Sequence, residues 1–430
     1  MATSLLQLPN ELLAQILGLA ISGEELCLQP LPTYTCRRFY LLGMPILYGY
    51  LNLRKINCID SPRIIQLLLR TFHETPSLGH NCRELAVQIV DPWRHVSSPS
   101  SQYPDFATLK QLCYALPNVN RLDVHYGFYE ELNTQTWNFI QYCLGIMSSL
   151  SHIELTAGDE PGPEVAKVMK YLNTPTLRRL TLTGSAGKTE FSDDEIANIQ
   201  KSNITAIHLV DFRDSAASAI HLVNNWPKAL EELILTEVIC DPYTHTDVEL
   251  VKSMLSKQQA FLKVLNLGGT RYYWRGKCLD LSNFKALQRL TLSQWANDTP
   301  SGTILQDVIS SVFAAPALKT FTWDFSSLSE DTEDWNAFGP LEEQFLQGLV
   351  KSVALDRIHI VFEPDAWDKK IDDGYPWDKI DELASKVQKT RITYSKPTIS
   401  RSDWLAQTFT FLSVYGPELE RLQKGTAWVE

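Results

Sequence analysis

The sequence has no long hydrophobic run and no long basic run. No stretch reaches the length of an uncharged membrane-spanning helix, and the first ten residues, MATSLLQLPN, lack the charged and apolar regions of a secretion signal. Acidic residues outnumber basic ones by 50 to 39, which gives a net charge of -11. Nucleic acids and anionic membranes select for clustered Lys and Arg. We therefore expect a protein of the cytoplasm, the nucleus or both, with neither nucleic acid nor membrane as its partner.

The sequence also lacks the motifs of a metal site or a catalytic centre. Its eight cysteines include no CxxC pair, so we expect reduced thiols and no bound metal. HExxH, GxSxG and a GxGxxG after a strand are all missing, and the nine histidines are dispersed. GSAGKT resembles a phosphate loop, but the position that requires its first glycine is Leu182. We expect no cofactor and no enzymatic activity.

What is present begins with an N-terminal helical module. The segment LPNELLAQIL starts at Leu8 and Pro9, and its apolar residues recur at three- and four-residue spacing, which is typical of an amphipathic helix. A second segment, YTCRRFY, ends at Tyr40, and PILYGYLNL follows it. With 44% hydrophobic and 21% charged residues, the rest of the 430-residue chain has ample material for a large core. The order indicates a short module ahead of a long array.

These residues resemble the F-box family over about positions 5 to 50, through Leu-Pro-x-Glu-Leu, Ile-Leu and the Cys-Arg-Arg-Phe cluster. The resemblance implies binding to the Skp adaptor of a cullin-RING ubiquitin ligase, and through it to a cullin. Pro30 and Pro32 depart from the family, because proline cannot sit inside its leucine-rich middle helix. The alternative is a helical cap that covers the first repeat. The implied adaptor-binding residues are Leu8, Pro9, Ile16, Leu17, Cys36, Arg37 and Phe39.

Beyond the module, the pattern L-x-x-L-x-L recurs. Clean copies are LRRLTL from Leu177, LEELIL from Leu230, LKVLNL from Leu262 and LQRLTL from Leu287. Degenerate copies are CRELAV, VNRLDV, LSHIEL, ITAIHL, LKTFTW and LDRIHI. The pattern and the spacing between successive copies resemble those of a leucine-rich-repeat array.

Each copy predicts a short strand, because its last three positions alternate apolar, polar, apolar. Helix signals lie between the copies: Ser61-Pro62, capping boxes at 192–195 and 246–249, and Gly339-Pro340. The prediction is an α/β horseshoe with parallel strands inside and helices outside. We expect an F-box-like module at 1–50, the repeat array at 51–398 and a C-terminal capping helix and tail at 399–430. An ordinary α/β domain is the alternative for the array.

The middle position of each strand predicts the recognition surface. If the array is a horseshoe, these positions form one polar row on its concave side, mildly acidic toward its N-terminal end. Tyr272, Tyr273 and Trp274, in a loop after a strand, are candidate partner anchors or loop-packing residues. In the tail, Trp404, Leu405, Phe409 and Leu412 predict the capping helix. The predicted substrate-binding row is Asp123, Glu154, Thr181, His208, Ile234, Asn266, Thr291, Thr322 and His359.

Two functional hypotheses follow for the chain. In the first, it is a non-catalytic substrate receptor: the N-terminal module holds the ligase scaffold, the repeats hold a protein target, and proximity raises the rate of ubiquitin transfer. In the second, it is a leucine-rich-repeat interaction scaffold without a ligase. The two hypotheses differ in whether the N-terminal apolar residues are exposed to a second protein or buried against the first repeat.

Overall fold

The computed structural model describes most of the repeats and the two N-terminal helices. The predictions for Pro30 and Pro32, for the capping box at 192–195, for residues 272–274 and for the helix at 404–412 concern positions outside the described residues. The chain divides into two compact units, residues 1–228 and 229–430. The structure describes residues 8–21, 36–54, 61–89, 106–125, 127–128, 130–157, 162–184, 200–236, 248–268, 279–293, 309–325, 340–361, 376–387, 389–395 and 401–402.

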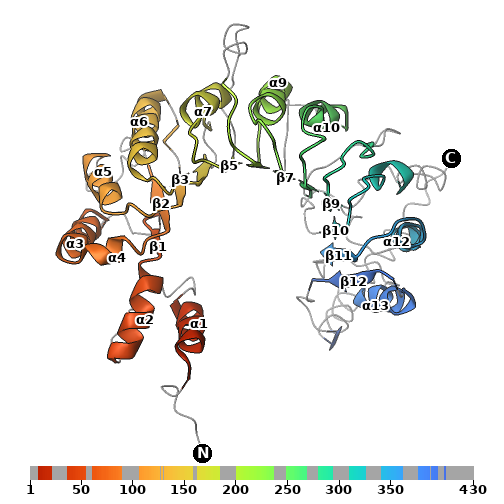
Figure 1. Cartoon of the computed structure of the whole chain (residues 1–430), viewed down its shortest axis with the longest axis horizontal. Coiled ribbons are helices and arrows are strands. Elements are labelled where there is room, and N and C mark those ends of the chain that lie inside the picture. Colours follow the sequence, from red (N-terminus) through yellow and green to blue (C-terminus); the bar gives the residue numbers. More distant parts are fainter. Residues whose placement is uncertain are drawn as a thin grey trace, which may run out of the picture. The chain divides into compact units, whose positions relative to one another are not determined.

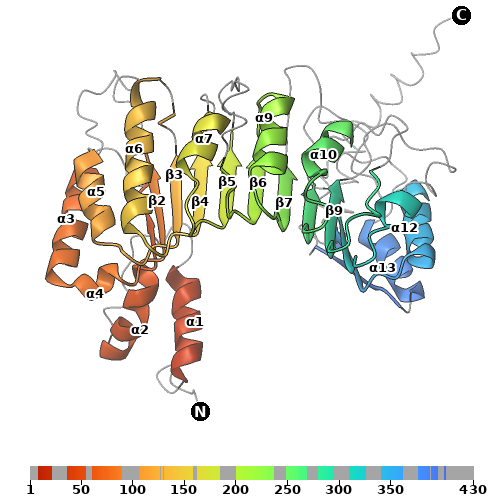
Figure 2. The same ribbon diagram turned by 45° about the horizontal axis from the view of Figure 1, so that its top comes forward.

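The first unit is a parallel sheet covered on one side by helices (Figures 1 and 2). Helices α1 and α2 form a pair beside β1, outside the layer of helices that covers the sheet. The elements are α1 (Asn10–Ile21), α2 (Arg37–Leu47), β1 (Tyr50–Asn52), α3 (Ser61–Glu74), α4 (Pro76–Gly79), β2 (Glu84–Gln88), α5 (Phe106–Tyr114), β3 (Arg121–His125), α6 (Glu130–Ile146), β4 (His152–Thr156), α7 (Val165–Tyr171), β5 (Arg179–Thr183), β6 (Ala206–Val210), α9 (Ala216–Ile220) and the π-helical turn η2 (His221–Asn225).

The second unit repeats the same arrangement, with its helices on one side of its strands (Figure 1). Its helix α12 begins at Pro340, where the proline predicted a helix start. The elements are β7 (Glu232–Thr236), α10 (Val248–Leu255), β8 (Val264–Leu267), β9 (Arg289–Ser293), β10 (Thr320–Asp324), α12 (Pro340–Ser352), β11 (Arg357–Val361), α13 (Pro376–Lys386) and β12 (Arg391–Tyr394).

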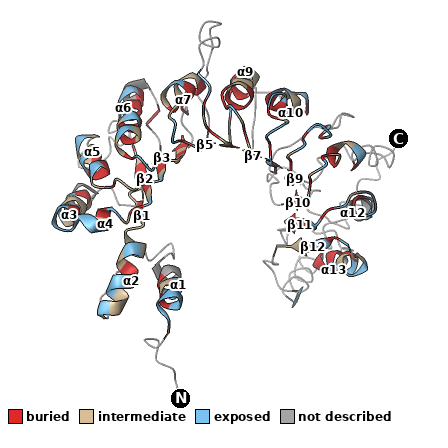
Figure 3. Ribbon diagram, in the orientation of Figure 1, coloured by how far each residue is buried: buried red, intermediate tan, exposed pale blue. Residues whose placement is uncertain are grey.

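Strand order follows chain order in both units, and every neighbouring pair is parallel from β1 to β6 and from β7 to β12. Side chains alternate between the two faces of each strand. In β4, Ile153 and Leu155 are buried under the helices while Glu154 lies on the other face. In Figure 3 the buried residues lie along the strands and on the helix sides that face them, and the exposed residues lie mainly on the outer sides of the helices. We call the side without helices the open face.

These elements confirm the predicted fold class, an α/β leucine-rich-repeat array of parallel strands and flanking helices. All ten pattern copies form strands that begin at their third residue. Helix regularity is lower than the pattern indicates: in residues 279–288, ahead of β9, the described backbone forms turns. The boundaries predicted at residues 50 and 398 stay predictions. In the described part of the chain, no helix combines the length and the apolar character needed to cross a membrane.

Candidate protein-binding surfaces

The α1–α2 helix pair is tied together by one arginine. The Arg38 guanidinium on α2 donates to Asn10 Oδ1 through Nε at 2.9 Å and through Nη2 at 2.7 Å, and Nη2 also donates to the carbonyl of Leu8 at 2.8 Å. These charge-assisted bonds join the start of α2 to the start of α1. At the other end of α2, the Tyr48 ring meets the Phe72 ring of α3 edge to face, with centroids 5.7 Å apart. Arg38 therefore fixes the pair, a role the sequence did not reveal.

Helix α1 carries two apolar stripes. Leu13 and Leu17 are buried, at 0% and 4% exposure, and lie on one side of the helix because they are four residues apart. Leu12 and Ile16 form the second stripe and are exposed to 45% and 39%. The first stripe supplies the packing of the helix. The second faces solvent in the described structure and is available to a partner.

Helix α2 adds further exposed apolar surface. Tyr40 is 41% exposed and Leu41 is 61% exposed. With Leu12 and Ile16 they make four large apolar side chains on one helix pair, which we call the apolar patch. Exposed apolar side chains that gather on one small element mark interaction sites more often than isolated ones do.

The residues implied by the F-box resemblance fall into three environments. Pro9, Ile16 and Arg37 are exposed, whereas Leu8 and Phe39 are half-buried. Leu17 belongs to the buried stripe. Cys36 caps α2, since its Sγ accepts a hydrogen bond from the backbone N–H of Phe39 at 3.5 Å. Their role in adaptor binding stays a prediction.

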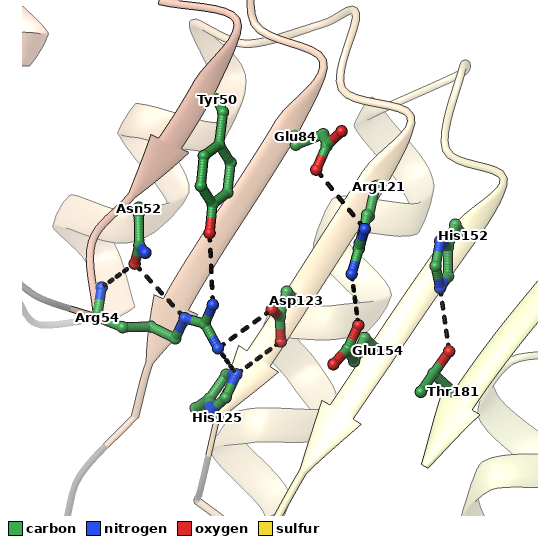
Figure 4. Close-up of polar contacts among 10 residues, drawn as sticks. All are labelled: Tyr50, Asn52, Arg54, Glu84, Arg121, Asp123, His125, His152, Glu154 and Thr181. Carbon is green, nitrogen blue, oxygen red and sulfur yellow. Dashed lines mark hydrogen bonds and ion pairs between the residues drawn. The ribbon is translucent and has the colours of Figure 1, made fainter. Parts of the chain in front are cut away.

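On the open face of the first unit, charged side chains are joined in a network (Figure 4). Arg54, just after β1, lies 3.4 Å from Asp123 Oδ2 through Nη1, and the same nitrogen contacts Nε2 of His125. His125 Nε2 lies 2.9 Å from Asp123 Oδ1. Arg54 also contacts Asn52 Oδ1, at 3.0 Å through its backbone N–H, and Tyr50 Oη, at 3.4 Å through Nη2. The carboxylate of Asp123, buried to 6% exposure, thus has cationic and imidazole neighbours.

A second charge cluster lies on the neighbouring strands (Figure 4). Arg121 of β3 donates to Glu154 Oε2 on β4 at 2.7 Å and lies 3.7 Å from Glu84 Oε2 on β2. Burial opposes the charged form of Arg121, but the hydrogen bond and the charge of Glu154 more than offset it, so the pKa of the guanidinium is raised. Asp123 and Glu154, the acidic members of the predicted row, are therefore paired with cations.

His152 lies beside this cluster. Its Nε2 is 3.2 Å from Thr181 Oγ1 on β5. Burial, followed by the positive charges of Arg121 and Arg179, lowers the pKa of His152 to about 4. The imidazole is consequently neutral at neutral pH and acts as a hydrogen-bonding group rather than a charge.

The open face of the second unit carries hydroxyls, an amide and basic groups, together with the carboxylate of Asp324 at the end of β10. Arg357 Nε donates to Thr393 Oγ1 at 3.1 Å, and His359 Nδ1 lies 3.0 Å from the same oxygen. Burial and then the charge of Arg357 lower the pKa of His359. Asn266 Oδ1 accepts from the backbone N–H of Gly268 at 2.8 Å.

The register confirms that the predicted row is a row within each unit. Asp123, Glu154, Thr181 and His208 are successive partners across β3 to β6. The members in the second unit, Ile234, Asn266, Thr291, Thr322 and His359, are successive partners across β7 to β11. Their binding role stays a prediction. The predicted row did not include the residues two positions earlier on the same strands, although period-two alternation places them on the same face; they include Arg121, His152, Arg179, Arg289 and Arg357.

Both surfaces offer contacts of the kinds that protein interfaces use. Within the described ranges, no group of three or more His, Cys, Asp or Glu side chains could hold a metal ion. The helix pair offers apolar contacts, and the open faces offer ion pairs and hydrogen bonds.

Comparison with known proteins gives distant structural likenesses. No protein-family model matches the chain, and no curated protein resembles it in sequence. Among solved structures, a chain of the yeast Rad7 and Elc1 complex is 12% identical with a TM-score of 0.38, over 94% of this chain and 97% of that one. The leucine-rich repeat-containing protein LegL7 from Legionella pneumophila is 13% identical with a TM-score of 0.35, over 71% and 98%. At such scores neither likeness carries an inference about function.

Proposed function

We propose that this chain is a non-catalytic substrate receptor. The α1–α2 pair binds a Skp-type adaptor and, through it, a cullin-based ubiquitin ligase, while the open faces of the repeats bind a target protein. Catalysis of ubiquitin transfer belongs to the ligase, and the chain contributes proximity.

The apolar patch carries this proposal. A helix pair that served only as a cap would turn its apolar residues toward the repeat core. Leu12, Ile16 and Leu41 instead remain exposed. Several exposed apolar side chains on one helix pair form the kind of surface that a protein interface buries. The F-box resemblance, which covers the same two helices, names the class of partner.

Co-purification with a Skp-type adaptor tests the proposal. We expect the wild-type chain to form a complex, and the double variant Ile16→Glu/Leu41→Glu to bind at least about 30-fold more weakly, because two charges would be buried in an apolar contact. Leu67→Glu is the matched control. Leu67 belongs to α3, not to the helix pair, and is 52% exposed, so its substitution should leave binding unchanged.

Two outcomes would contradict the proposal. If the wild-type chain does not bind the adaptor, the chain is better explained as a repeat scaffold without a ligase. If the double variant binds as well as the Leu67→Glu control, the adaptor does not use the apolar patch. Circular dichroism of each variant separates lost binding from lost folding, and the substituted residues are exposed, so folding should persist.

A further inference from the structure

One row on the open face of the second unit is basic. Arg289, Arg357 and Arg391 are the first residues of β9, β11 and β12, and the register joins them through Thr320 of β10. Each precedes an inward-pointing residue of its strand, so alternation places the arginines on the open face. Lys319 directly precedes Thr320, so alternation does not place it on the open face, and it adds its charge from the edge of the sheet where these strands begin. We call Arg289, Lys319, Arg357 and Arg391 the cation row.

The cation row is exposed and uncompensated. All four side chains are exposed. In the part of the chain that the structure describes, Arg289, Lys319 and Arg391 take part in no side-chain ion pair or hydrogen bond. Arg357 donates through Nε to Thr393, which orients the guanidinium and leaves both terminal amino groups for a ligand.

The sign of this charge is opposite to that of the whole chain. The first residues of strands β9 to β12, together with the residues directly before them, include four cations and one anion, Asp356. The complete chain has a net charge of -11. On the first unit, by contrast, Arg54 and Arg121 lie against carboxylates of the chain itself. A local basic surface on an acidic protein attracts anionic partners.

The spacing of the row indicates what kind of anion fits. Adjacent strands lie about 4.8 Å apart, so the row from β9 to β12 extends over about 14 Å. A phosphate dianion is held by donors that converge on one group, whereas these cations are spread along a line. Several separate carboxylates along a peptide match this linear arrangement of cations better than one phosphate group does. Polar side chains of the neighbouring positions Thr291, Thr322 and His359 lie alongside.

We propose that the cation row binds an acidic segment of a partner protein, rich in Asp and Glu, that crosses β9 to β12 on the open face. Carboxylates of the segment pair with the arginines, and its remaining polar groups contact the threonines beside them. This binding is independent of the apolar patch, since it involves only the second unit, and it holds whether or not the helix pair engages a ligase.

Fluorescence anisotropy of the full chain tests the inference. The probe is a fluorescein-labelled ten-residue peptide of alternating Glu and Ser, and its counterpart has Gln in place of Glu. We expect the Glu peptide to bind and the Gln peptide to bind at least about tenfold more weakly. The variant Arg357→Gln/Arg391→Gln should weaken Glu-peptide binding about tenfold, and added salt should weaken wild-type binding. Lys351→Gln removes an exposed charge from α12 and should change affinity less than twofold.

Several results would overturn the inference. These are failure of the Glu peptide to bind, equal affinity for the Glu and Gln peptides, or unchanged affinity in the double variant. A phosphothreonine peptide or a single-stranded oligonucleotide that binds more tightly than the Glu peptide through the same arginines would replace the carboxylate segment with another anion. Circular dichroism of the variants confirms that a lost signal reflects lost contacts.

Discussion

At the scale of single residues, the neighbours of a side chain on the sheet decide its charge. His152 and His359 both lie on the open face, where burial and adjacent arginines lower their pKa values. Both imidazoles therefore bind a proton less readily in the folded chain than in the unfolded chain. Neutral histidine between arginines keeps the face polar without adding to its positive charge.

His152 should make the stability of the first unit pH-dependent. Its folded pKa, about 4, lies below the ordinary value of 6.5, so the unfolded chain binds more protons between these values. Stability is then full above pH 6.5 and decreases as pH falls toward 4. From pH 7 to pH 5 we expect a loss of about 1 kcal/mol, reduced from the full shift because the ring is partly exposed.

Urea titrations at pH 7 and pH 5, followed by circular dichroism, measure this effect. His152→Gln keeps a hydrogen-bonding group opposite Thr181 but cannot gain a proton. The difference in free energy of unfolding between the wild type and this variant should change with pH in the stated direction. A difference that stays constant from pH 7 to pH 5 would show that His152 does not titrate as proposed.

At the scale of elements, the repeat pattern predicted the strands of its ten copies but not the strands at the two ends of the array. All ten copies became strands because a leucine followed by alternating apolar residues satisfies burial on one face only. β1 and β12 were not predicted: they have three and four residues, and no full copy of the pattern accompanies them. The position of Arg54 opposite Asp123 depends on β1, so that ion pair could not be predicted either.

The candidate surfaces, too, could be predicted from the sequence only in part. The row of strand centres was predictable because period two and equal register fix it. Pairing of Arg121 with Glu84 and Glu154 requires knowledge of which strands are neighbours, which no local pattern supplies. The two stripes of α1 are equally apolar, so the sequence did not show that Leu17 is buried and Ile16 exposed.

Two glycines give a matched test of helix packing in the first unit. At Gly79 in α4, an added Cβ would lie 2.2 Å from the carbonyl oxygen of Ala115, a backbone atom that cannot move alone. Gly79→Ala should therefore destabilise the unit by about 1–3 kcal/mol. At Gly145 in α6, a Cβ meets nothing within 4 Å, so Gly145→Ala should stabilise the helix by about 0.5–1 kcal/mol.

Urea titrations of both variants test whether their free energies of unfolding change in opposite directions. The comparison is informative because each change adds the same single methyl group, and only the surroundings differ. Equal effects of the two substitutions would mean that α4 does not approach the end of α5 as closely as described.

At the scale of the whole molecule, the chain is two compact units, each a stack of repeats. In such arrays each repeat gains stability mainly from its neighbours in sequence. The core of the second unit includes an aromatic cluster: Phe345 of α12 lies 4.9 Å from Trp323, 6.0 Å from Phe313 and 6.3 Å from Phe321, measured between ring centroids. A defect there should remain within that unit.

Phe345→Ala tests whether the units unfold separately. The side chain is fully buried, so its removal should cost about 3–5 kcal/mol. Hydrogen exchange with mass spectrometry should show faster exchange of backbone amides in β10 and β11 and unchanged exchange in β3 to β5. Leu180→Ala, a buried site in β5, should give the reverse pattern. Equal acceleration in both units by either variant would mean that the whole array unfolds as one cooperative body, and stability would then pass beyond neighbouring repeats.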